Sequence, residues 1–425
     1  MIAVIMAGGK GTRITSMYSD IPKSMIPILG KPILEYQIET LARQGITDII
    51  LVVGYLGNVI KDYFKEGVAF GVAISYIEEI SPLGTAGALF YLKQKVTSDF
   101  LLVNGDLIFD VDIKRLLSFH KLNGGVATIV THPNSHPYDS GIIESNDNGM
   151  VTKWLHKEDE RFWYKNRVNS GIHMLSPRIF SLFSELKKID LDRDILRPMI
   201  CQHILFAYDT PEYIKDMGTP DRLLNVERDV RNGLVQQKNL LNKQKAIFLD
   251  RDGTINKDVG FLRKIDDFEL IEGVTQAIKK INQSGFLAIV ITNQPVIARG
   301  EMSFEELEMV HKKMETLLGR EGAFLDDIFF CPHHPDAGFS GERKELKIKC
   351  TCRKPAPGLI FRARDKYNID LSQSYMIGDS KTDEEVAINA GCSPCRIGDP
   401  CYKESLSCSS LKDCINIILS KKENL

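Results

Sequence analysis

Residues 246–254 read AIFLDRDGT, an apolar run that ends abruptly in two acids separated by one residue. Four apolar residues followed by acid, base, acid and glycine are typical of a buried strand that leads into a polar loop. Asp250 and Asp252 are two positions apart, so their side chains point to the same side of an extended chain. We therefore expect a site with two carboxylates at the end of this strand.

Three later stretches carry side chains suited to the same site. FLAIVITNQ ends a second expected strand in hydrogen-bonding groups that suit phosphoryl oxygens. CRKPAPG supplies two cations that would offset charge in a transition state. MIGDSKTDEE ends a third strand in an acid that suits magnesium, followed by a supporting acid. In chain order these residues are Thr292, Asn293, Arg353, Lys354, Asp379 and the supporting Asp383.

The pattern predicts phosphoryl transfer through a carboxylate nucleophile. One acid of the pair would attack phosphorus, and the other would protonate the leaving oxygen and later activate water. We expect Asp250, Asp252 and Asp379 to hold a magnesium ion. Two solvated loop acids are the alternative explanation for an isolated Asp-x-Asp pair, and the three later stretches argue against it.

Length and composition bound the class of protein. A chain of 425 residues exceeds what one hydrophobic core usually supports, which predicts two domains. A formal net charge of −2 and 26% charged residues give no global attraction to nucleic acid or to anionic membrane. No stretch approaches the length of an apolar membrane span, so we expect a soluble, cytoplasmic protein. Nine cysteines then suggest reduced thiols or metal ligands rather than a disulfide framework.

A polar stretch near the middle of the chain divides it. Residues 227–245 lack sustained apolar periodicity, and we predict domains 1–230 and 245–425 joined by a linker at 231–244. Both halves alternate strand-like and helical runs, which predicts two α/β domains with mostly parallel sheets. The helical run 31–45 has Pro32 in its first turn and Gly45 at its end. In the second half, Ser303 and Glu306 have the spacing of a capping box.

Four residues between the second and third strands suggest a structural zinc site. Cys331, His333, Cys350 and Cys352 form two close pairs across a polar loop, as a closed tetrahedral zinc site requires. A chance cluster of thiols is the alternative, and a nucleic-acid-reading finger is disfavoured because no recognition helix lies between the pairs. His334 is the adjacent candidate ligand. Zinc would hold the loop that carries the Arg-Lys pair. The later cysteines, from Cys392 to Cys414, are expected to be thiols rather than a second metal site.

The N-terminal half opens with a glycine-rich loop after a strand, AGGKGTR at residues 7–13. Glycines let the backbone turn sharply and bring its amide groups close to an anion. A tight turn without a ligand is the alternative. Arg13 in the loop, Lys23 and Asp106 favour a nucleotide, because nucleotidyl transfer needs cations around a triphosphate and a carboxylate for magnesium.

Six motifs and the residues between them carry a family resemblance over about residues 1–225. MAGGKGTR, PKSMIPILGKPILEY, SPLGTAGAL, NGD, VNSGIHML and KDMGTPDR occur in this order, and the segment resembles the sugar-1-phosphate nucleotidyltransferases. The resemblance implies a Rossmann-like sheet, catalytic Arg13 and Lys23, and magnesium at Asp106 and Asp216. The implied nucleotide-binding residues are Gly8, Gly9, Gly11, Thr12, Arg13, Lys23, Gly84 and Thr85. The implied sugar-binding residues are Gly141, Glu144, Lys157, Asn169 and Gly171, with His156 where the family usually has an acid.

The second half resembles the haloacid dehalogenase superfamily of phosphatases over about residues 245–395. FLDRDGTIN, TNQ, IARG, CPHHP, the CxCRKP run and GD most resemble heptose-1,7-bisphosphate phosphatases. The resemblance implies a Rossmannoid fold, catalytic Asp250, Asp252, Thr292, Asn293, Arg353 and Lys354, magnesium, and zinc in the loop. Pro295 and Val296 replace the usual Ser-Gly.

The fusion suggests a function, because a heptose bisphosphatase yields the heptose 1-phosphate that a sugar-1-phosphate nucleotidyltransferase consumes. The first half resembles D-glycero-α-D-manno-heptose 1-phosphate guanylyltransferases most, which implies GTP as donor and GDP-heptose as product. The alternatives are a histidinol-phosphate-type or other sugar phosphatase fused to a transferase that uses another nucleoside triphosphate, or a half that only binds a regulatory ligand. A homo-oligomer stays open.

Overall fold

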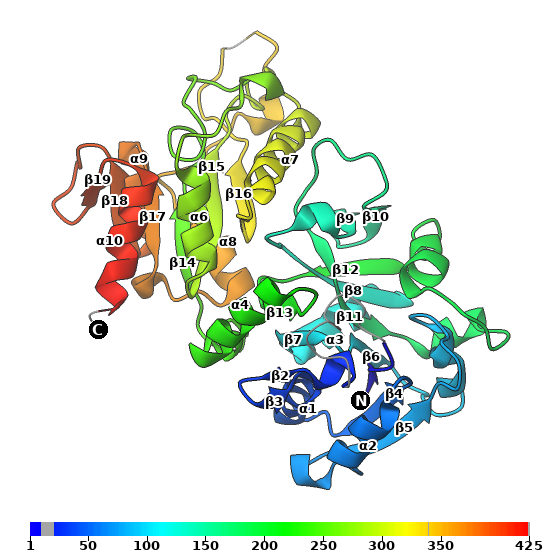
Figure 1. Cartoon of the computed structure of the whole chain (residues 1–425). Coiled ribbons are helices and arrows are strands. Elements are labelled where there is room, and N and C mark those ends of the chain that lie inside the picture. The colour runs from blue at the N-terminus through cyan, green and yellow to red at the C-terminus, as the bar shows by residue number, and fades with distance from the viewer. Residues whose placement is uncertain (10–20, 339, 424–425) are drawn as a thin grey trace. The chain divides into compact units, whose positions relative to one another are not determined.

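The structure is a computed structural model that describes residues 1–9, 21–338 and 340–423 (Figure 1). The chain divides into two compact units, each described by itself below. The first comprises Met1–His132, Ile143–Leu155 and Val168–Asn239, and the second comprises Pro133–Ile142, His156–Arg167 and Leu240–Leu425. Two short segments of the N-terminal half are thus grouped with the second unit. The last boundary between the two units follows Asn239, inside the expected linker.

A mixed sheet forms the centre of the first unit. Within the described residues it has nine strands, in the order β10-β9-β11-β6-β1-β4-β5, with β8 paired to β11 and β12. β1 runs parallel to β4 and β6, and β4 runs parallel to β5, whereas β11 is antiparallel to β6. The strands are β1 Ile2–Met6, β4 Asp48–Val53, β5 Ala73–Glu78, β6 Phe100–Asn104, β8 Ala127–His132, β9 Ile142–Ser145, β10 Val151–Leu155, β11 Val168–Leu175 and β12 Leu205–Asp209.

Two short antiparallel ladders and five helices complete the described part of the first unit. The ladders pair β2 Pro27–Ile28 with β3 Lys31–Pro32, and β7 Leu107–Asp110 with β13 Tyr213–Asp216. The helices are α1 Ile33–Arg43, α2 Gly57–Phe64, α3 Ile113–Asn123, α4 Pro220–Arg231 and α5 Leu234–Gln237. The helix predicted after Pro32 is confirmed as α1, because Leu34, Ile38 and Leu41 bury one face of it in the core.

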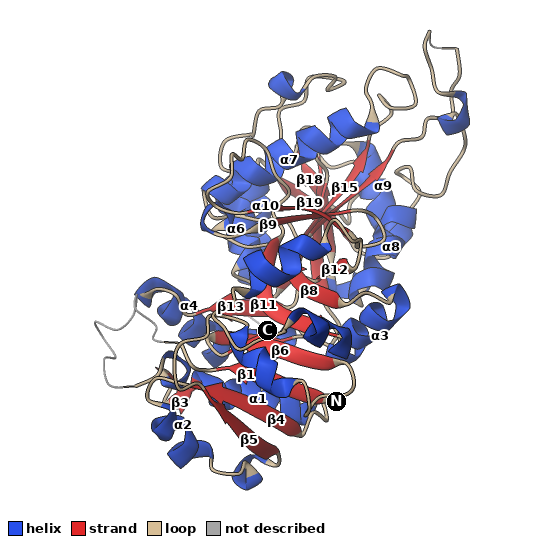
Figure 2. Ribbon diagram, turned by 90° about the vertical axis from the view of Figure 1, so that its right-hand side faces the viewer, coloured by secondary structure: helices blue, strands red, loops and turns tan. Residues whose placement is uncertain are grey.

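A parallel sheet forms the centre of the second unit, with helices on both faces (Figure 2). In the part of the chain that the structure describes, its six strands lie in the order β16-β15-β14-β17-β18-β19. The strands are β14 Lys245–Leu249, β15 Phe286–Asn293, β16 Asp327–Cys331, β17 Tyr375–Gly378, β18 Ser393–Ile397 and β19 Leu406–Cys408. The helices are α6 Val274–Asn282, α7 Phe304–Arg320, α8 Gly358–Tyr367, α9 Lys381–Ala390 and α10 Leu411–Glu423.

The apolar run 246–249 is continuous because β14 is buried on both faces. Ile247 and Leu249 pack into the core formed with α6, α7 and α10, whereas Ala246 and Phe248 pack into the core formed with α8 and α9. Strands covered on both faces lack the alternation of a half-exposed strand. The capping box predicted at Ser303 and Glu306 is confirmed at the start of α7.

Short 3-10 helices and one π-helix lie between these elements. The 3-10 helices are η1 Lys23–Met25, η2 Val68–Phe70, η3 Gly87–Leu92, η4 Pro137–Asp139, η5 Pro177–Leu182, η7 Arg197–Met199, η8 Ile265–Asp267, η9 Lys344–Leu346 and η10 Leu371–Gln373, and the π-helix is η6 Leu191–Leu196. Among the described residues, no helix is both long and apolar enough to cross a membrane.

Candidate active sites and metal centre

The first unit contains a cavity of about 850 Å³ where its parallel strands β1, β4 and β6 end. Six residues predicted from the sequence lie on its wall: Gly8, Gly9, Lys23, Gly84, Thr85 and Asp106. Gly11, Thr12 and Arg13 lie outside the described residues. Ligands of open α/β sheets bind at the carboxyl ends of the strands. Segments far apart in the sequence therefore meet at the place where such a fold binds its ligand.

Two glycines of this cavity are required by close packing. Gly84 has φ +79°, and a Cβ there would lie 2.4 Å from the carbonyl oxygen of Ile189. A Cβ on Gly8 would lie 2.7 Å from Oε2 of Glu79 and 3.2 Å from the backbone nitrogen of Gly54. Gly84 excludes a side chain, and a side chain at Gly8 would require Glu79 to move, so the backbone itself lines the cavity there and can approach a phosphate or a base closely.

Two acids predicted to hold magnesium lie near one end of a β-ladder. Lys23 Nζ donates a hydrogen bond to Oδ2 of Asp106 within an ion pair. Asp216 lies opposite Leu107, the residue after Asp106, and accepts from Arg222 at 2.8 Å. The backbone amide of Met217 also donates to the carbonyl of Asp106, at 3.2 Å. Carboxylate oxygens are hard donors that fit Mg²⁺, so this pair suits the ion.

Three of the predicted sugar-binding residues lie on two neighbouring strands, Glu144 in β9 and Asn169 and Gly171 in β11. Gly171 has φ +81° and donates its N–H to Oδ1 of Asn169 at 3.3 Å. A Cβ on Gly171 would lie 2.5 Å from Nδ2 of Asn104, which lines the cavity. Glu144 lies in β9 of the first unit. Gly141 and Lys157 belong to the two segments that are grouped with the second unit.

The second unit places the predicted phosphatase residues at one edge of its parallel sheet. Asp250 follows β14, Thr292 and Asn293 end β15, and Asp379 follows β17. Asn293 fixes the peptide of Lys354: its Oδ1 accepts the Lys354 N–H at 3.0 Å, and its Nδ2 donates to the Lys354 carbonyl at 3.2 Å. The motifs converge because the carboxyl ends of parallel strands lie at the same edge.

Lys354 is buried between two acids. Its Nζ lies 2.7 Å from Oδ1 of Asp250 and 2.6 Å from Oδ1 of Asp383. Burial raises the pKa of Asp250 to about 7, although Lys354 opposes the rise. Burial alone would lower the pKa of Lys354, but the two carboxylates outweigh burial and raise it. The ammonium group is therefore charged and placed to neutralise anionic groups around Asp250.

Three acids form a compact oxygen cluster suited to magnesium. Carboxylate oxygens of Asp250, Asp379 and Asp383 all lie within 4.8 Å of one another. Gly253, with φ +78°, leaves room for this cluster, because a Cβ there would lie 2.0 Å from Oδ2 of Asp379. Asp383 also caps α9 through Ser380. It therefore has the place of the supporting acid, with its other oxygen on Lys354.

The side chain of Asp252 is held by hydrogen bonds outside this oxygen cluster. Arg251 Nη2 donates to both of its oxygens at 2.9 Å, Gln294 Nε2 donates to Oδ2 at 2.9 Å, and Asn256 Nδ2 donates to Oδ1 at 3.0 Å. Burial would raise the pKa of Asp252, but Arg251 and these hydrogen bonds lower it overall. Among the described acids, the oxygen cluster contains Asp250 and Asp379 and not the carboxylate of Asp252.

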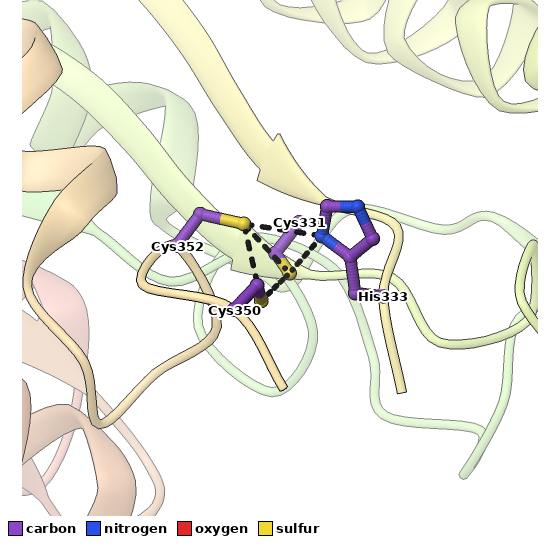
Figure 3. A group of neighbouring side chains, drawn as sticks. All are labelled: Cys331, His333, Cys350 and Cys352. Carbon is purple, nitrogen blue, oxygen red and sulfur yellow. Dashed lines mark hydrogen bonds between the residues drawn. The ribbon is translucent and has the colours of Figure 1, made fainter. Parts of the chain in front are cut away.

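Cys331, His333, Cys350 and Cys352 converge in the loop between β16 and α8 (Figure 3). Sγ of Cys352 lies 3.3 Å from the sulfurs of Cys331 and Cys350, and Nδ1 of His333 lies 3.2 Å from Cys352 Sγ. Tetrahedral zinc with metal–sulfur bonds of about 2.3 Å has sulfur–sulfur edges of roughly 3.8 Å. The four atoms therefore fit zinc closely. His334 lies outside this cluster, and its Nδ1 accepts from the Asp336 N–H.

The loop of the predicted zinc ligands is connected directly to the predicted cations Arg353 and Lys354. Arg353 follows Cys352 in the chain, and its Nη1 donates to the carbonyl of His333 at 3.3 Å.

The loop after β15 is also ordered by packing: Val296 is buried in the core, and the Arg299 N–H donates to the Pro295 carbonyl at 3.0 Å. Pro295 and Val296 are thus accommodated in a turn in which Val296 keeps negative φ.

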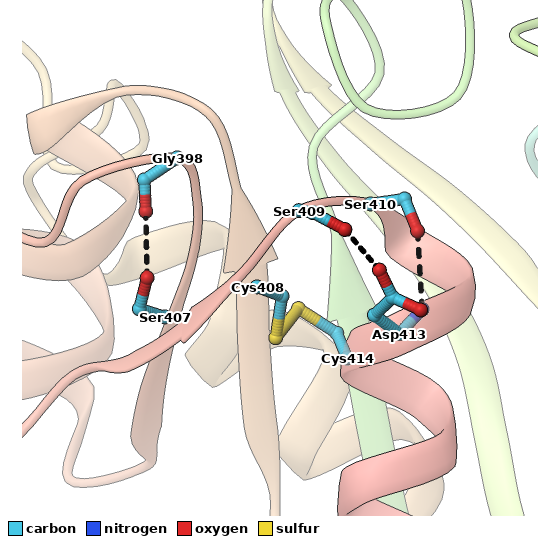
Figure 4. The surroundings of a disulfide bond; sticks show 7 residues. All are labelled: Gly398, Ser407, Cys408, Ser409, Ser410, Asp413 and Cys414. Carbon is cyan, nitrogen blue, oxygen red and sulfur yellow. Dashed lines mark hydrogen bonds between the residues drawn. A yellow bond between two sulfur atoms is a disulfide. The ribbon is translucent and has the colours of Figure 1, made fainter.

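The later cysteines differ in part from the prediction. Cys392 and Cys395 are buried thiols and Cys401 is an exposed thiol, as expected. The expectation of thiols at Cys408 and Cys414 is wrong, because a disulfide joins them (Figure 4). Cys408 ends β19 and Cys414 lies in the first turn of α10, and this tight strand-to-helix connection brings their Cα atoms to 5.4 Å.

Several site residues were not singled out from the sequence. Arg251 and Gln294 hold Asp252, and Asp192 accepts from Asn169 Nδ2 at 3.3 Å. Asp192 lies in the one-turn π-helix η6, and burial raises its pKa to about 6. Glu79 lines the cavity of the first unit. Each is an ordinary polar residue in a loop or a helical turn; Arg251, Gln294 and Glu79 lie close to a recognised motif, and Asp192 carries no sequence signal of its own.

The described geometry is that of two enzyme classes in one chain. The nucleotidyl transferase family matches residues 2–233, more than half of the chain, and the chain belongs to this family. The HAD-hydrolase-like family matches residues 351–398, which contain Arg353, Lys354 and Asp379. The protein is therefore an enzyme that combines a nucleotidyltransferase domain with a phosphatase domain of the haloacid dehalogenase type.

Individual relatives specify the family of the phosphatase domain. The D-glycero-beta-D-manno-heptose-1,7-bisphosphate 7-phosphatase of Yersinia pestis is 43% identical over 145 residues, which are 34% of this chain and 75% of the relative. The enzyme of the same name from Escherichia coli strain K12 is 44% identical over 34% of this chain and 74% of its own length. The chain thus also belongs to the family of these phosphatases.

One solved structure illustrates the first class. A provisionally assigned glucose-1-phosphate thymidylyltransferase of Bacillus anthracis, solved with sucrose, has a TM-score of 0.50 and is 22% identical. It covers 55% of this chain and 96% of its own. At this identity the likeness shows the fold alone.

Proposed function

We propose that the chain is a bifunctional enzyme of nucleotide-activated heptose synthesis. The phosphatase domain hydrolyses the 7-phosphate of D-glycero-D-manno-heptose 1,7-bisphosphate. The nucleotidyltransferase domain then transfers GMP from GTP to heptose 1-phosphate and releases pyrophosphate. One observation carries the proposal: a relative of heptose bisphosphatases is joined to a sugar-1-phosphate nucleotidyltransferase fold, so the product of one reaction has the chemistry of the substrate of the other.

The phosphatase reaction proceeds in two displacements at phosphorus. An oxygen of Asp250 attacks the 7-phosphate, the bond from phosphorus to the sugar oxygen breaks, and Asp252 gives that oxygen a proton. Asp252 then takes a proton from water, which attacks the aspartyl-phosphate and releases phosphate and free Asp250. Lys354, 2.7 Å from Asp250, neutralises the charge that develops on the phosphoryl oxygens.

Metal ions have separate places in this account. The cluster of Asp250, Asp379 and Asp383 would hold magnesium, with Asp252 as a further predicted ligand, and the bound ion would neutralise phosphate charge. The sulfur and imidazole ligands would hold zinc, which stays structural because four protein ligands close its coordination. The observed bond from Arg353 to His333 supports a role for zinc in holding the catalytic loop.

The transfer reaction is a single in-line displacement. An oxygen of heptose 1-phosphate attacks the α-phosphorus of GTP, the bond to the β-phosphate oxygen breaks, and pyrophosphate leaves. Lys23 would offset charge at the reacting phosphate, and Asp106 and Asp216 would hold magnesium. The cavity beside Gly8, Gly84 and Thr85 would receive the nucleotide.

The two reactions make different demands on the anomeric carbon. The curated relatives are named for the β-configured bisphosphate, whereas the first half resembles enzymes that use the α-configured 1-phosphate. Hydrolysis breaks the phosphorus–oxygen bond of the 7-phosphate, far from the anomeric centre, while transfer acts on the anomeric phosphate itself. We therefore propose that the transferase requires the α-configured 1-phosphate and that the phosphatase accepts the α-configured bisphosphate.

The test is a pair of assays on the purified full chain. Phosphate release is measured with α- and β-heptose 1,7-bisphosphate and with histidinol phosphate, and pyrophosphate release is measured with heptose 1-phosphate and each of four nucleoside triphosphates. We expect turnover of the bisphosphate and of GTP. Preference for histidinol phosphate would replace the phosphatase assignment, and a half that binds its ligand without turnover would identify a regulatory module.

A further inference from the structure

The turn that carries Asp106 is held by a buried side chain of α1. β6 ends at Asn104 and β7 begins at Leu107, so Asp106 lies in a short link between the two strands. Gln37 is 1% exposed, and its Nε2 donates to the carbonyl of Asn104 at 2.9 Å and to the carbonyl of Leu107 at 2.8 Å. One amide group thus ties together the two ends of the segment that places the Asp106 carboxylate.

Backbone groups hold the same turn at its two middle residues. The N–H of Gly105 donates to the carbonyl of Met6, at the end of β1, at 3.0 Å. A Cβ on Gly105 would lie 2.8 Å from that same oxygen, so the turn packs directly on β1. The carbonyl of Asp106 accepts from the N–H of Met217, the residue after the predicted magnesium ligand Asp216. The turn therefore contacts both β1 and the segment that carries the second predicted ligand.

A second glutamine of α1 makes a similar contact farther along the chain. Gln44 follows Gln37 by seven positions, about two helical turns, so both lie on the same face of the helix. Nε2 of Gln44 donates to the carbonyl of Val111 at 2.8 Å, and its Oε1 accepts from the N–H of Ile113 at 2.9 Å. Gln44 thus satisfies both ends of its amide, beyond the end of β7 that is remote from Asp106.

Packing alone does not explain a glutamine at position 37. The Oε1 of Gln37 is buried and has no hydrogen-bond partner among the described residues. A buried polar atom without a partner costs free energy, and an apolar side chain of similar size would avoid that cost. Carbonyl oxygens can accept only from the NH2 end of the amide. The two bonds to the turn therefore account for both the residue and its orientation.

We propose that Gln37 is a positioning residue for the magnesium ion of nucleotidyl transfer. By holding both ends of the turn, it fixes the place from which the Asp106 carboxylate faces Lys23 and the expected ion. The inference rests on the proposed transfer reaction, and it adds a residue that directly follows a recognised motif. Loss of a contact that orients a metal ligand typically costs about 10–100-fold in metal affinity or activity.

Gln37→Met removes both donors and keeps a side chain of similar length. GTP binding to the full chain is measured by calorimetry with magnesium and in buffer free of it, which gives the factor by which magnesium strengthens binding. We expect Gln37→Met to reduce this factor by about 10-fold and to leave binding without magnesium unchanged. The magnesium concentration for half-maximal pyrophosphate release should rise by a similar factor. Gln37→Asn, whose shorter amide cannot span both carbonyls, should act in the same direction and carries the test if Gln37→Met does not fold.

Gln44→Met is the matched control, because it removes two side-chain hydrogen bonds from the same face of α1, away from Asp106. This variant should keep the wild-type effect of magnesium on GTP binding. An equal loss in both variants, an unchanged magnesium effect in Gln37→Met, or a wild type whose GTP binding ignores magnesium overturns the inference. Absence of pyrophosphate release from the wild type would instead overturn the proposed transfer reaction, and calorimetry would still decide the role of Gln37.

Discussion

Lys354 Nζ lies 2.7 Å from Oδ1 of Asp250, and both groups are buried at the carboxyl edge of the parallel sheet. The pairing keeps a cation beside the acid that would attack phosphorus. Asn293 holds the Lys354 peptide through two hydrogen bonds, so the cation is positioned by its backbone as well as by its charge. The structure thus fixes the expected nucleophile and its counter-charge together.

Asp250→Asn should abolish phosphate release, because an amide of the same shape cannot form the aspartyl-phosphate. Nucleotidyl transfer should stay intact, since Asp250 belongs to the second unit only. Phosphate and pyrophosphate release are measured on the same preparation. Phosphatase activity above a few per cent of wild type would exclude the aspartyl-phosphate mechanism.

Lys23→Ala should slow nucleotidyl transfer by roughly 10²–10³, the usual scale for removal of one transition-state donor. Lys23 lines the cavity and pairs with Asp106. Lys31→Ala is the control, because Lys31 pairs with Glu39 away from the lining residues. A near-normal rate for Lys23→Ala, measured as pyrophosphate release at saturating substrates, would show that the phosphate site lies elsewhere.

Gly84→Ala should impair nucleotidyl transfer and spare the phosphatase. The new Cβ would lie 2.4 Å from the Ile189 carbonyl oxygen, so the loop that carries Thr85 must move. Gly45→Ala is a close control, because Gly45 has the same φ of +79° with nothing within 4 Å of its Cβ. Both variants carry the same backbone strain, and only the first carries the collision. Equal transfer rates for the two would show that the packing of Gly84 is unimportant for the site.

Cys350→Ser should lower the zinc content toward zero and depress phosphatase turnover or raise its Michaelis constant. Structural zinc in small peptides binds with about 10–16 kcal/mol of apparent free energy coupled to folding. This unit has its own apolar cores, so loss of zinc should disorder the loop rather than the whole domain.

Metal analysis of reduced, chelator-free protein tests the zinc prediction, with one zinc expected per wild-type chain. Cys401→Ser is the control, because Cys401 is an exposed free thiol outside the cluster. Zinc absent from the wild type, or unchanged in Cys350→Ser, would reduce the four residues to ordinary thiols and a histidine. Pyrophosphate release should be the same in all three proteins.

The sequence predicted the site best where a motif follows an apolar strand. Asp250, Asn293 and Asp379 each follow or end a strand of one parallel sheet, and that topology alone brings them to the same edge. The cluster of Cys331, His333, Cys350 and Cys352 was predicted because close thiol and imidazole pairs are rare away from metals. The glycines of the N-terminal half were predicted because a glycine-rich loop directly follows an expected strand.

Contacts between distant side chains could not be predicted in this way. The orientation of Asp252 depends on Gln294, which follows another strand, as well as on donors of its own loop, and the place of Asp383 depends on a buried Lys354. Glu79 reaches its cavity because two glycines leave space for it. The disulfide of Cys408 and Cys414 follows from a tight connection whose path is not written in local propensity.

The central claim is that the two domains catalyse consecutive reactions, and a coupled turnover measures it directly. Wild-type chain is incubated with α-heptose 1,7-bisphosphate, GTP and magnesium, and phosphate, pyrophosphate and GDP-heptose are followed together. We predict phosphate release first, then pyrophosphate and GDP-heptose in equal amounts. From the bisphosphate, Asp250→Asn should make neither phosphate nor GDP-heptose. The same variant should recover GDP-heptose synthesis when heptose 1-phosphate is supplied. Phosphate release without any nucleotide-sugar, from either sugar phosphate and with any nucleoside triphosphate, would contradict the account.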